Sequence, residues 1–182
     1  MFSANQDLAG QRKDTVNNAE TTGVFCWNLA TYELRDAVNV SAEWLAEDVD
    51  EFERAGLKKT PAGLMDCAMV KQSPVRFECR YYSTLRLPGN GPMGSVDVVI
   101  GRVVGIHIDE AVLTDGKIDL GKTNPIARCG YHEYAVIRSD AVFEMIIPGD
   151  AKQLIGLEGN SEQAKQISKG ALEPGKDEVK EK

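Results

Sequence analysis

The sequence has no apolar run that approaches the length of a membrane span. Its first residues, Met-Phe-Ser-Ala-Asn-Gln, have neither the basic start nor the apolar core of a secretory signal. We therefore expect no membrane contact and a cytoplasmic protein. The sequence also has no internal repeat and no glycine fingerprint of the Rossmann dinucleotide-binding type. What remains is a chain of 182 residues, 42% hydrophobic and 27% charged, which is the balance of one ordinary globular domain.

Positive charge, histidine and paired cysteines are all scarce. The formal net charge of -7 argues against a general nucleic-acid binder, although a local basic patch could still hold one small phosphate ligand. Only His107 and His132 could complete a metal site, and no Cys-x-x-Cys pair occurs, so structural zinc is not expected. We expect reduced thiols packed mostly as small hydrophobes, with a nucleophilic cysteine as the minor alternative, at Cys26, Cys67, Cys79 and Cys129.

A basic pair close to the N-terminus precedes a helix-start signal. Arg12 and Lys13 stand immediately before Asp14 and Thr15, either of which could cap the backbone amides that follow. Because a helix N-terminus has free N–H groups and a partial positive charge, this pair would suit a phosphate. Residues 2–6, just upstream, form a short strand-like piece, so the segment could hold the phosphate end of a nucleotide or flavin. The alternative is a solvated Arg-Lys pair beside a capped helix.

The first third of the chain predicts short helices around one buried strand. We expect a helix over about 15–22, with Val16 and Ala19 on its inner face and Gly23 at its end, and then a buried strand over 24–29. Thr31 is expected to cap a second helix. Residues 41–57 have an acidic, helical pattern, and their expected inward anchors are Trp44, Leu45, Val49 and Phe52.

The strongest strand signal lies over 75–87, where apolar side chains alternate with polar ones as in a half-buried antiparallel strand. Turn-forming residues over 88–95 predict a hairpin that leads to a second long strand over 96–108. That strand is apolar on both faces, so it belongs in the middle of a barrel or at a subunit interface. We expect one face to carry Val98, Ile100, Val104, Ile106 and Ile108, and the other Val99 and Val103.

The last third of the chain is predicted to contain a hairpin-like excursion over 109–119, an irregular or briefly helical stretch over 122–134, and a final strand over 142–147. Beyond Gly159 the charge density rises and aromatic residues vanish. We therefore expect a domain over 1–160 and a charged, flexible tail over 161–182. The fold class that these elements favour is α+β, mainly β: a small β-barrel with peripheral helices.

Several separate motifs, in a fixed order, resemble those of the flavin reductase-like, FMN-binding split-barrel proteins. Each motif is weak alone, but their ordered combination over about residues 2–149 is fairly specific. The motifs in the first half of the chain are Lys13-Asp14-Thr15 with Asn18, Gly23-Val24-Phe25 with Asn28-Leu29, Asp50-Glu51-Phe52-Glu53 with Ala55-Gly56-Leu57, and Ser73-Pro74-Val75 with Glu78-Cys79. The later motifs are the run from Gly101 to His107, the run from Asp115 to Asp119, and Pro125-Ile126-Ala127-Arg128 with Gly130 and Tyr134.

The resemblance implies a split β-barrel that forms a homodimer and binds one FMN per subunit near the dimer interface. NADH or NADPH would pass hydride to the flavin, which would then reduce a second acceptor, such as a monooxygenase partner or another electron acceptor. By analogy, the flavin ring and ribityl chain would lie along Ser3, Ala4 and Asn5. The phosphate would be held by Arg12, Lys13 and Thr15, with Asp14 shaping the bend. Further residues expected to approach the same region, within the subunit or from its partner, are Arg128, Gly130 and Tyr134.

The resemblance also carries a departure from the family pattern. Members normally have further strands before the position of Phe2, with an Asn-x-Ala-Pro-x-Ser-like segment that lines the flavin. The absence of those strands here would open a barrel edge and remove flavin contacts. Two other functions therefore stay open: a flavin-binding electron carrier without nicotinamide chemistry, and a homologue that holds no cofactor. The sequence identifies no catalytic acid or base, although His132, in a loop, is a better proton-transfer candidate than His107.

Overall fold

The structure of the protein is a computed structural model that describes residues 1–7, 9–46, 49–90 and 94–143. Residues 1–141 form one unit and residues 142–182 form another, of which only Val142 and Phe143 are described. The strand expected over 142–147 therefore lies mostly outside the described residues. The tail expected over 161–182 lies wholly outside them.

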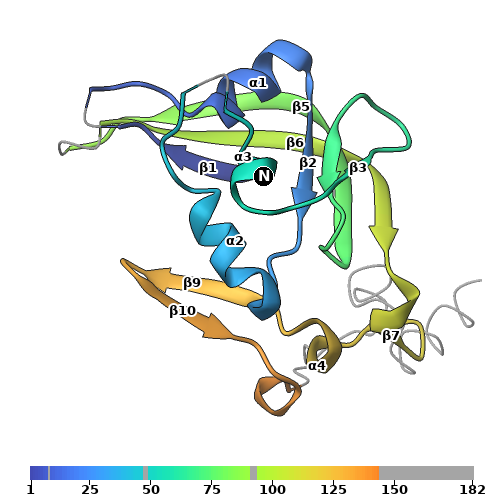
Figure 1. Cartoon of the computed structure of the whole chain (residues 1–182). Coiled ribbons are helices and arrows are strands. Elements are labelled where there is room, and N and C mark those ends of the chain that lie inside the picture. Colours follow the sequence, from blue (N-terminus) through green and yellow to red (C-terminus); the bar gives the residue numbers. More distant parts are fainter. Residues whose placement is uncertain (8, 47–48, 91–93, 144–182) are drawn as a thin grey trace, which may run out of the picture. The chain divides into compact units, whose positions relative to one another are not determined.

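A four-stranded antiparallel sheet forms the centre of the first unit (Figure 1). Two 13-residue strands dominate it, and both have the bounds that the sequence predicted. The alternating apolar and polar residues of 75–87 suit a pleated strand with one face buried, and the β-branched residues of 96–108 suit its long partner strand. In the order of the sheet, the strands are β1 (Phe2–Asn5), β6 (Val96–Ile108), β5 (Val75–Leu87) and β2 (Val24–Asn28).

Two bulges interrupt the pairing of β5 with β6, and the sequence pattern gave no sign of them. Val104 is the extra residue on β6, because Val103 pairs with Cys79 and Gly105 with Glu78. A second extra residue, Tyr82, lies on β5. A bulge bends its strand and shifts the alternation of faces. The expected continuous apolar face from Val98 to Ile108 is therefore wrong beyond the bulge, although the alternation holds before it.

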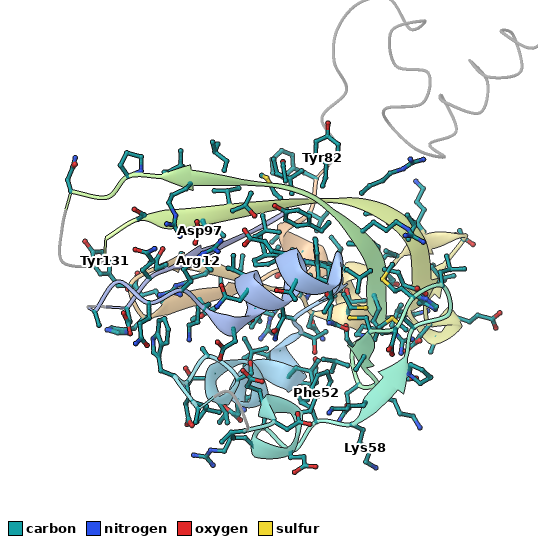
Figure 2. All side chains as sticks on the ribbon, turned by 90° about the horizontal axis from the view of Figure 1, so that it is seen from above. Arg12, Phe52, Lys58, Tyr82, Asp97 and Tyr131 are labelled. Carbon is teal, nitrogen blue, oxygen red and sulfur yellow. The ribbon has the colours of Figure 1, made fainter. Side chains whose placement is uncertain are left out.

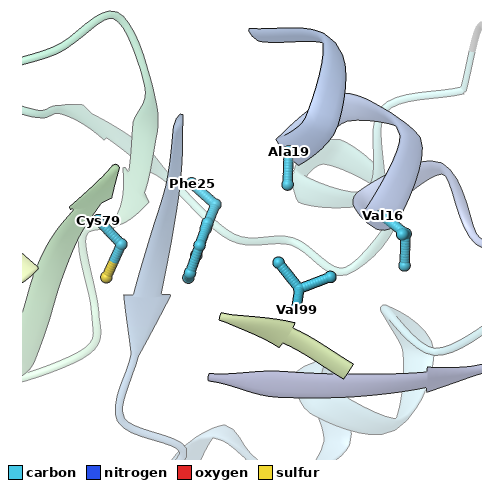
Figure 3. Packing of buried hydrophobic residues seen from close by; sticks show 5 residues of the cluster. All are labelled: Val16, Ala19, Phe25, Cys79 and Val99. Atoms are coloured by element: carbon cyan, nitrogen blue, oxygen red, sulfur yellow. The ribbon is translucent and has the colours of Figure 1, made fainter. Parts of the chain in front are cut away.

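Helix α1 (Asp14–Thr22) packs on one face of this sheet. Its buried residues are Val16 and Ala19, the two predicted for its inner face, and it ends at Gly23 as expected. Gly23 has φ 73°, a left-handed conformation that costs glycine little. Figure 3 shows the small core that results, in which the helix meets three strands through Val16, Ala19, Phe25, Cys79 and Val99.

The core includes a close approach of backbone to an aromatic ring. A Cβ atom added at Gly101, on β6, would lie 2.5 Å from ring atoms of Phe25 on β2. Phe25 in turn meets Phe2 of β1 edge to face, with ring centroids 5.2 Å apart. The absence of a side chain at position 101 is therefore what allows this ring to lie against the middle of the sheet.

Shorter elements surround the sheet, and one of them corrects a prediction. A 3-10 turn η1 (Tyr32–Leu34) leads into α2 (Arg35–Val40), which confirms the second helix, but Thr31 makes no side-chain capping bond. Between Ser41 and Leu57 the described residues form only the four-residue α3 (Glu51–Arg54), so the long acidic helix is wrong. Charged residues of the segment form ion pairs, Arg54 with Glu43 and Asp50 with Lys59, and Trp44 stays half exposed, so the segment does not bury an apolar face as a long helix would.

The remaining described elements are hairpins, the four-residue helix α4 and the 3-10 turns η2 and η3. The pairs of strands are β3 (Lys59–Pro61) with β4 (Ala68–Val70), β7 (Leu113–Thr114) with β8 (Lys117–Ile118), and β9 (Ile126–Gly130) with β10 (Glu133–Val136). The turns are η2 (Glu110–Val112), α4 (Leu120–Thr123) and η3 (Ser139–Ala141). Among the described residues, no helix is both long and apolar enough to cross a membrane.

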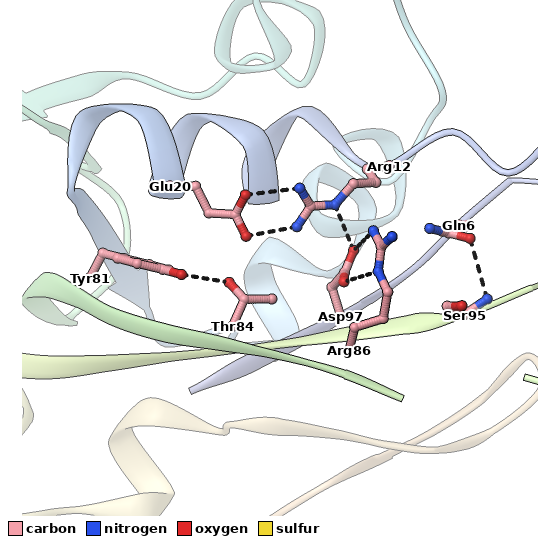
Figure 4. Close-up of polar contacts among 8 residues, drawn as sticks. All are labelled: Gln6, Arg12, Glu20, Tyr81, Thr84, Arg86, Ser95 and Asp97. Carbon is pink, nitrogen blue, oxygen red and sulfur yellow. Dashed lines mark hydrogen bonds and ion pairs between the residues drawn. The ribbon is translucent and has the colours of Figure 1, made fainter. Parts of the chain in front are cut away.

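A buried carboxylate joins α1 and the strand hairpin. Asp97 on β6 is 1% exposed and accepts hydrogen bonds from the guanidinium groups of Arg12, at 2.8 Å, and Arg86, at 2.9 Å (Figure 4). Arg12 also forms a bidentate pair with Glu20 of α1, at 2.7 and 2.8 Å. These charges compensate a burial that would otherwise be costly, so the network fixes α1 over β5 and β6.

We expect Asp97→Asn to lower the free energy of unfolding by about 2–4 kcal/mol, because it leaves two arginines facing a neutral amide. Urea denaturation followed by circular dichroism measures the change. The control is Asp36→Asn, whose side chain is 86% exposed and should alter stability by less than about 0.5 kcal/mol. Equal effects of the two substitutions would contradict the role given to the network.

Candidate functional site

A groove of about 580 Å³ lies where β1, the start of α1 and the segment 41–45 meet. We call it the β1 groove. β1 and the start of α1 follow each other in the chain and form one wall of the groove, and the segment 41–45 adds residues from further along the chain. It brings together seven of the ten residues predicted for the site, which are Ser3, Ala4, Asn5, Lys13, Asp14, Thr15 and Arg128.

One end of the β1 groove is rich in hydrogen-bond donors. Lys13 is the N-cap of α1, and its side chain makes no capping bond, so the expected capping by Asp14 or Thr15 is wrong. The amides of Val16 and Asn17 both donate to the Lys13 carbonyl, at 2.9 and 3.3 Å. The amides of Asp14 and Thr15 precede these and have no helical acceptor. Two open amides, a hydroxyl and an ammonium therefore border one space, which suits a phosphate.

Lys13 is held over an aromatic ring. Its Nζ lies 3.7 Å from the centroid of the Trp44 ring and 3.4 Å from the carbonyl oxygens of both Ala42 and Glu43. Among the described residues it forms no ion pair, so its charge is available to an anionic ligand. The same holds for Arg128, whose guanidinium donates to the Tyr131 carbonyl at 2.9 Å.

Trp44 lines the β1 groove, although its helical spacing predicted burial. It was expected to be an inward anchor, but 51% of it is exposed and it lines the β1 groove together with Leu45. The helical spacing of the apolar residues suggested burial, and nothing local indicated that this segment would lie open beside Lys13. Acidic residues also reach the groove, and one of them, Glu43, is paired with Arg54 at 3.2 Å.

Arg12 does not join the groove. Its guanidinium turns toward the sheet, where Glu20 and Asp97 take up its donors (Figures 2 and 4). The hydrogen bonds that Arg12 donates to Glu20 and Asp97 stabilise its charged form, so they raise the pKa of Arg12 above its ordinary value. Adjacent basic residues thus have opposite surroundings, Arg12 within an ion-pair network and Lys13 at a groove.

The other two predicted residues lie on the β9–β10 hairpin. Tyr134 lines a second groove of about 600 Å³ between this hairpin and α2, and Arg128 lines both grooves. Gly130 lines neither groove. It has φ 116° and pairs with Glu133, next to the point where the register of the hairpin shifts between Glu133 and Tyr134. Tyr134 therefore borders the neighbouring groove and not the β1 groove itself, and Ala42 and Arg128 line both.

The two histidines have different surroundings. His107 on β6 lies 2.6 Å from the buried carboxylate of Glu78, which also accepts the amides of Gly63 and Leu64 at 2.8 Å each. Burial acts to raise the pKa of Glu78, but the hydrogen bonds from His107 and the two amides outweigh it, and the pKa is lowered. His132 lines the second groove. His107 is therefore part of a structural contact, as its place in a strand suggested.

The curled, mainly β sheet with few helices has the split-barrel fold of flavin reductase-like proteins. Residues 1–122 match the flavin reductase like domain family, and this chain belongs to that family. An uncharacterized protein, BH2278, from Halalkalibacterium halodurans is 31% identical over 125 residues. That match covers 69% of this chain and 60% of the relative, so the chain spans somewhat less than two thirds of the relative's length.

Two solved structures show the same fold. Nitrilotriacetate monooxygenase component B from Bacillus cereus is 30% identical, with a TM-score of 0.70, and the likeness covers 79% of this chain and 70% of that one. An FMN-binding domain of a flavin reductase-like enzyme from Shewanella baltica is 14% identical, with a TM-score of 0.54 and coverage of 80% and 79%. At 14% identity the second likeness concerns the fold alone.

We expect acid to weaken the contact between α1 and the sheet. Arg12 lowers the pKa of Glu20 from 4.5 to about 2, so the unfolded chain takes up this proton at a higher pH than the folded chain does. The stabilisation is therefore complete above pH 4.5 and is lost as the pH falls toward 2. Glu20→Gln should remove roughly 1 kcal/mol of stability at neutral pH, allowing for partial exposure, and less near pH 2.

Urea denaturation at several pH values between 2 and 7 measures this difference. The control is Glu33→Gln, which removes an exposed carboxylate on η1 that forms no ion pair among the described residues. A loss of stability in Glu20→Gln that stays constant across the whole pH range would contradict the assignment.

Proposed function

We propose that this chain is an FMN-dependent oxidoreductase of the flavin reductase type. It takes hydride from NADH or NADPH and passes the electrons to a second acceptor, for which a monooxygenase partner is the first candidate. The observation that carries the proposal is the β1 groove, in which β1, the open start of α1 and Arg128 border one space. The likeness to a monooxygenase component B supports the choice of partner.

The residues of the β1 groove fit FMN. A terminal phosphate needs positive charge and several donors, and Lys13, the Thr15 hydroxyl and the two open amides of α1 supply them. The exposed side chains of β1, Ser3 and Asn5, offer polar contacts along the groove for a ribityl chain. Arg12 is left out of this phosphate site because its donors are already bound by Glu20 and Asp97.

The protein's part in the reaction is to bind and orient. Bound FMN would supply the ring that accepts hydride and later releases electrons. Lys13 would neutralise the phosphate, and its contact with Trp44 would hold the ammonium in place when the groove is empty of ligand. Arg128, anchored by the Tyr131 carbonyl, would present positive charge where the two grooves meet, and a nicotinamide donor is also anionic.

The proposal includes a homodimer, for which an exposed apolar face of the sheet offers the surface. Residues that pair directly across β5 and β6 share a face, and on the face opposite α1 several remain uncovered. Leu85 is 54% exposed, Leu87 45% and Ile100 38%. Tyr82 also projects from this side of the sheet, away from α1 (Figure 2). A contiguous apolar surface of this kind is typical of a protein interface.

We expect Lys13→Ala to weaken FMN binding at least tenfold, because the phosphate loses its only unpaired ammonium among the described groove residues. Titration of FMN with quenching of flavin fluorescence measures the dissociation constant. The control is Lys58→Ala, an exposed lysine outside the groove (Figure 2), which should leave the affinity unchanged. An unchanged affinity for Lys13→Ala would move the phosphate to another site.

Hydride transfer is tested separately on the FMN-loaded protein. Loss of the yellow flavin absorbance on anaerobic addition of NADH or NADPH is the expected result. Tight FMN binding without bleaching by either donor would contradict the reductase proposal and leave an electron carrier. A chain that binds no FMN at all would contradict both.

We expect Leu85→Glu to shift the protein from dimer toward monomer, because it places a charge at the centre of the exposed apolar face. Sedimentation velocity at micromolar concentration measures the distribution. The matched control is Ile118→Glu on β8, where a 38% exposed apolar residue lies on a different hairpin. An unchanged dimer in Leu85→Glu, or a monomeric wild type, would contradict this interface.

A further inference from the structure

Two cysteines that are 41 positions apart in the sequence, Cys26 and Cys67, meet at the free edge of the sheet. β2 is an edge strand, and its odd-numbered residues bond to β5: the Gly23 carbonyl accepts from Tyr81 at 2.8 Å, and the Leu29 amide donates to Val75 at 2.9 Å. Since backbone groups alternate in direction along a strand, the amide of Cys26 points away from β5.

The β3–β4 hairpin covers that free side. The amide of Val70 on β4 donates to the Asn28 side chain of β2 at 2.9 Å. Cys67 stands one residue before β4, and β4 contacts β2. The Cys67 thiol lies 3.8 Å from the carbonyl oxygen of Ala68, and Cys26 and Cys67 line the same groove. The two cysteines therefore border one space between the edge strand and the hairpin.

This arrangement separates the chemistry of the two thiols. The hydrogen bonds from Cys26 stabilise a thiolate and lower the pKa of Cys67 to about 7. Donation to Cys67 and then burial raise the pKa of Cys26 well above its ordinary range. The thiolate therefore forms more readily at Cys67, whereas Cys26 stays protonated until its partner has reacted.

Both thiols are open to small molecules. They line a third groove, of about 550 Å³, which we call the thiol groove and which shares Thr15 and Ser41 with the β1 groove. The other two cysteines differ in this respect: Cys79 is buried in the core, and Cys129 lies exposed on β9. The described residues contain no group of three or more side chains suited to a metal ion, so the pair is better matched to redox chemistry than to metal binding.

We propose that Cys26 and Cys67 form a peroxide-sensitive pair, in which Cys67 is oxidised and Cys26 then closes an intramolecular disulfide. The Cys67 thiolate attacks one oxygen of hydrogen peroxide, the O–O bond breaks, and the departing hydroxide takes up a proton to leave as water. The Cys26 thiol gives up its proton and attacks the resulting sulfenic acid, so that the S–S bond forms and the S–O bond breaks with loss of a second water. Two thiols and one peroxide become one disulfide and two waters, and two electrons pass from sulfur to peroxide.

The disulfide would tie the edge strand β2 to the segment that precedes β4. Because Thr15 and Ser41 border both grooves, this bridge lies next to the space proposed for FMN. The pair itself does not depend on that proposal, since its chemistry needs neither flavin nor nicotinamide. Oxidation of the full chain without added FMN therefore tests the pair by itself.

The first measurement is the product of oxidation. Treatment of the reduced protein with equimolar hydrogen peroxide at pH 7 should lower the intact mass by two hydrogens and remove two titratable thiols. Peptide mapping should show Cys26 joined to Cys67. The double variant Cys79→Ser, Cys129→Ser should give the same product, because neither of its lost thiols takes part. A disulfide that contains Cys129, or loss of no thiol, would overturn the proposal.

The second measurement works on the wild type even if a variant fails to fold. Alkylation of Cys67 by iodoacetamide should be roughly tenfold faster at pH 7 than that of a free cysteine peptide, with a midpoint near pH 7. In Cys26→Ala the sulfenic acid at Cys67 should persist and be trapped by dimedone, and the alkylation midpoint should move to higher pH. A Cys67 that alkylates no faster than the free peptide would overturn the proposal.

Discussion

The buried carboxylate of Asp97 is the interaction on which the arrangement of this unit depends. It lies under α1 with almost no contact with water, and two arginines from different parts of the chain compensate its charge. Arg12 is thereby held at the sheet and is linked onward to Glu20 on the helix itself. The helix starts at a fixed place as a result. Lys13, the next residue, is left to border the β1 groove with the open amides that follow it.

The same ion-pair network explains why two neighbouring basic residues serve different ends. Local sequence presents Arg12 and Lys13 as one pair beside a helix start, and on that basis both were expected at the phosphate. Arg12 has the planar, forked group that suits two carboxylates at once, and the fold supplies them from 8 and 85 positions away. Lys13 has an aromatic neighbour in Trp44 instead. The difference arises from contacts across the fold, which a local pattern does not contain.

Elements governed by short-range patterns could be predicted from the sequence, and those that depend on tertiary contacts could not. The bounds of β5 and β6 and the inner face of α1 follow directly from alternation, turn chemistry and helical spacing. The bulges at Tyr82 and Val104 do not, because either register satisfies the same run of apolar residues. The segment 41–57 had helical spacing but no surface to bury against. Seven predicted residues line one groove, and they had been predicted from family motifs that occur in a fixed order along the chain.

The contact between Gly101 and Phe25 links two strands that are not neighbours in the sheet. The ring of Phe25 fills the volume that a side chain at position 101 would need, and it also packs against Phe2 of the edge strand β1. Positions 25 and 101 are therefore coupled in space, so the residue at one limits the size of the residue at the other. A homologue that acquires even a methyl group at 101 must shrink or tilt the ring at 25. Such a homologue would also loosen β1, and with it the wall of the β1 groove.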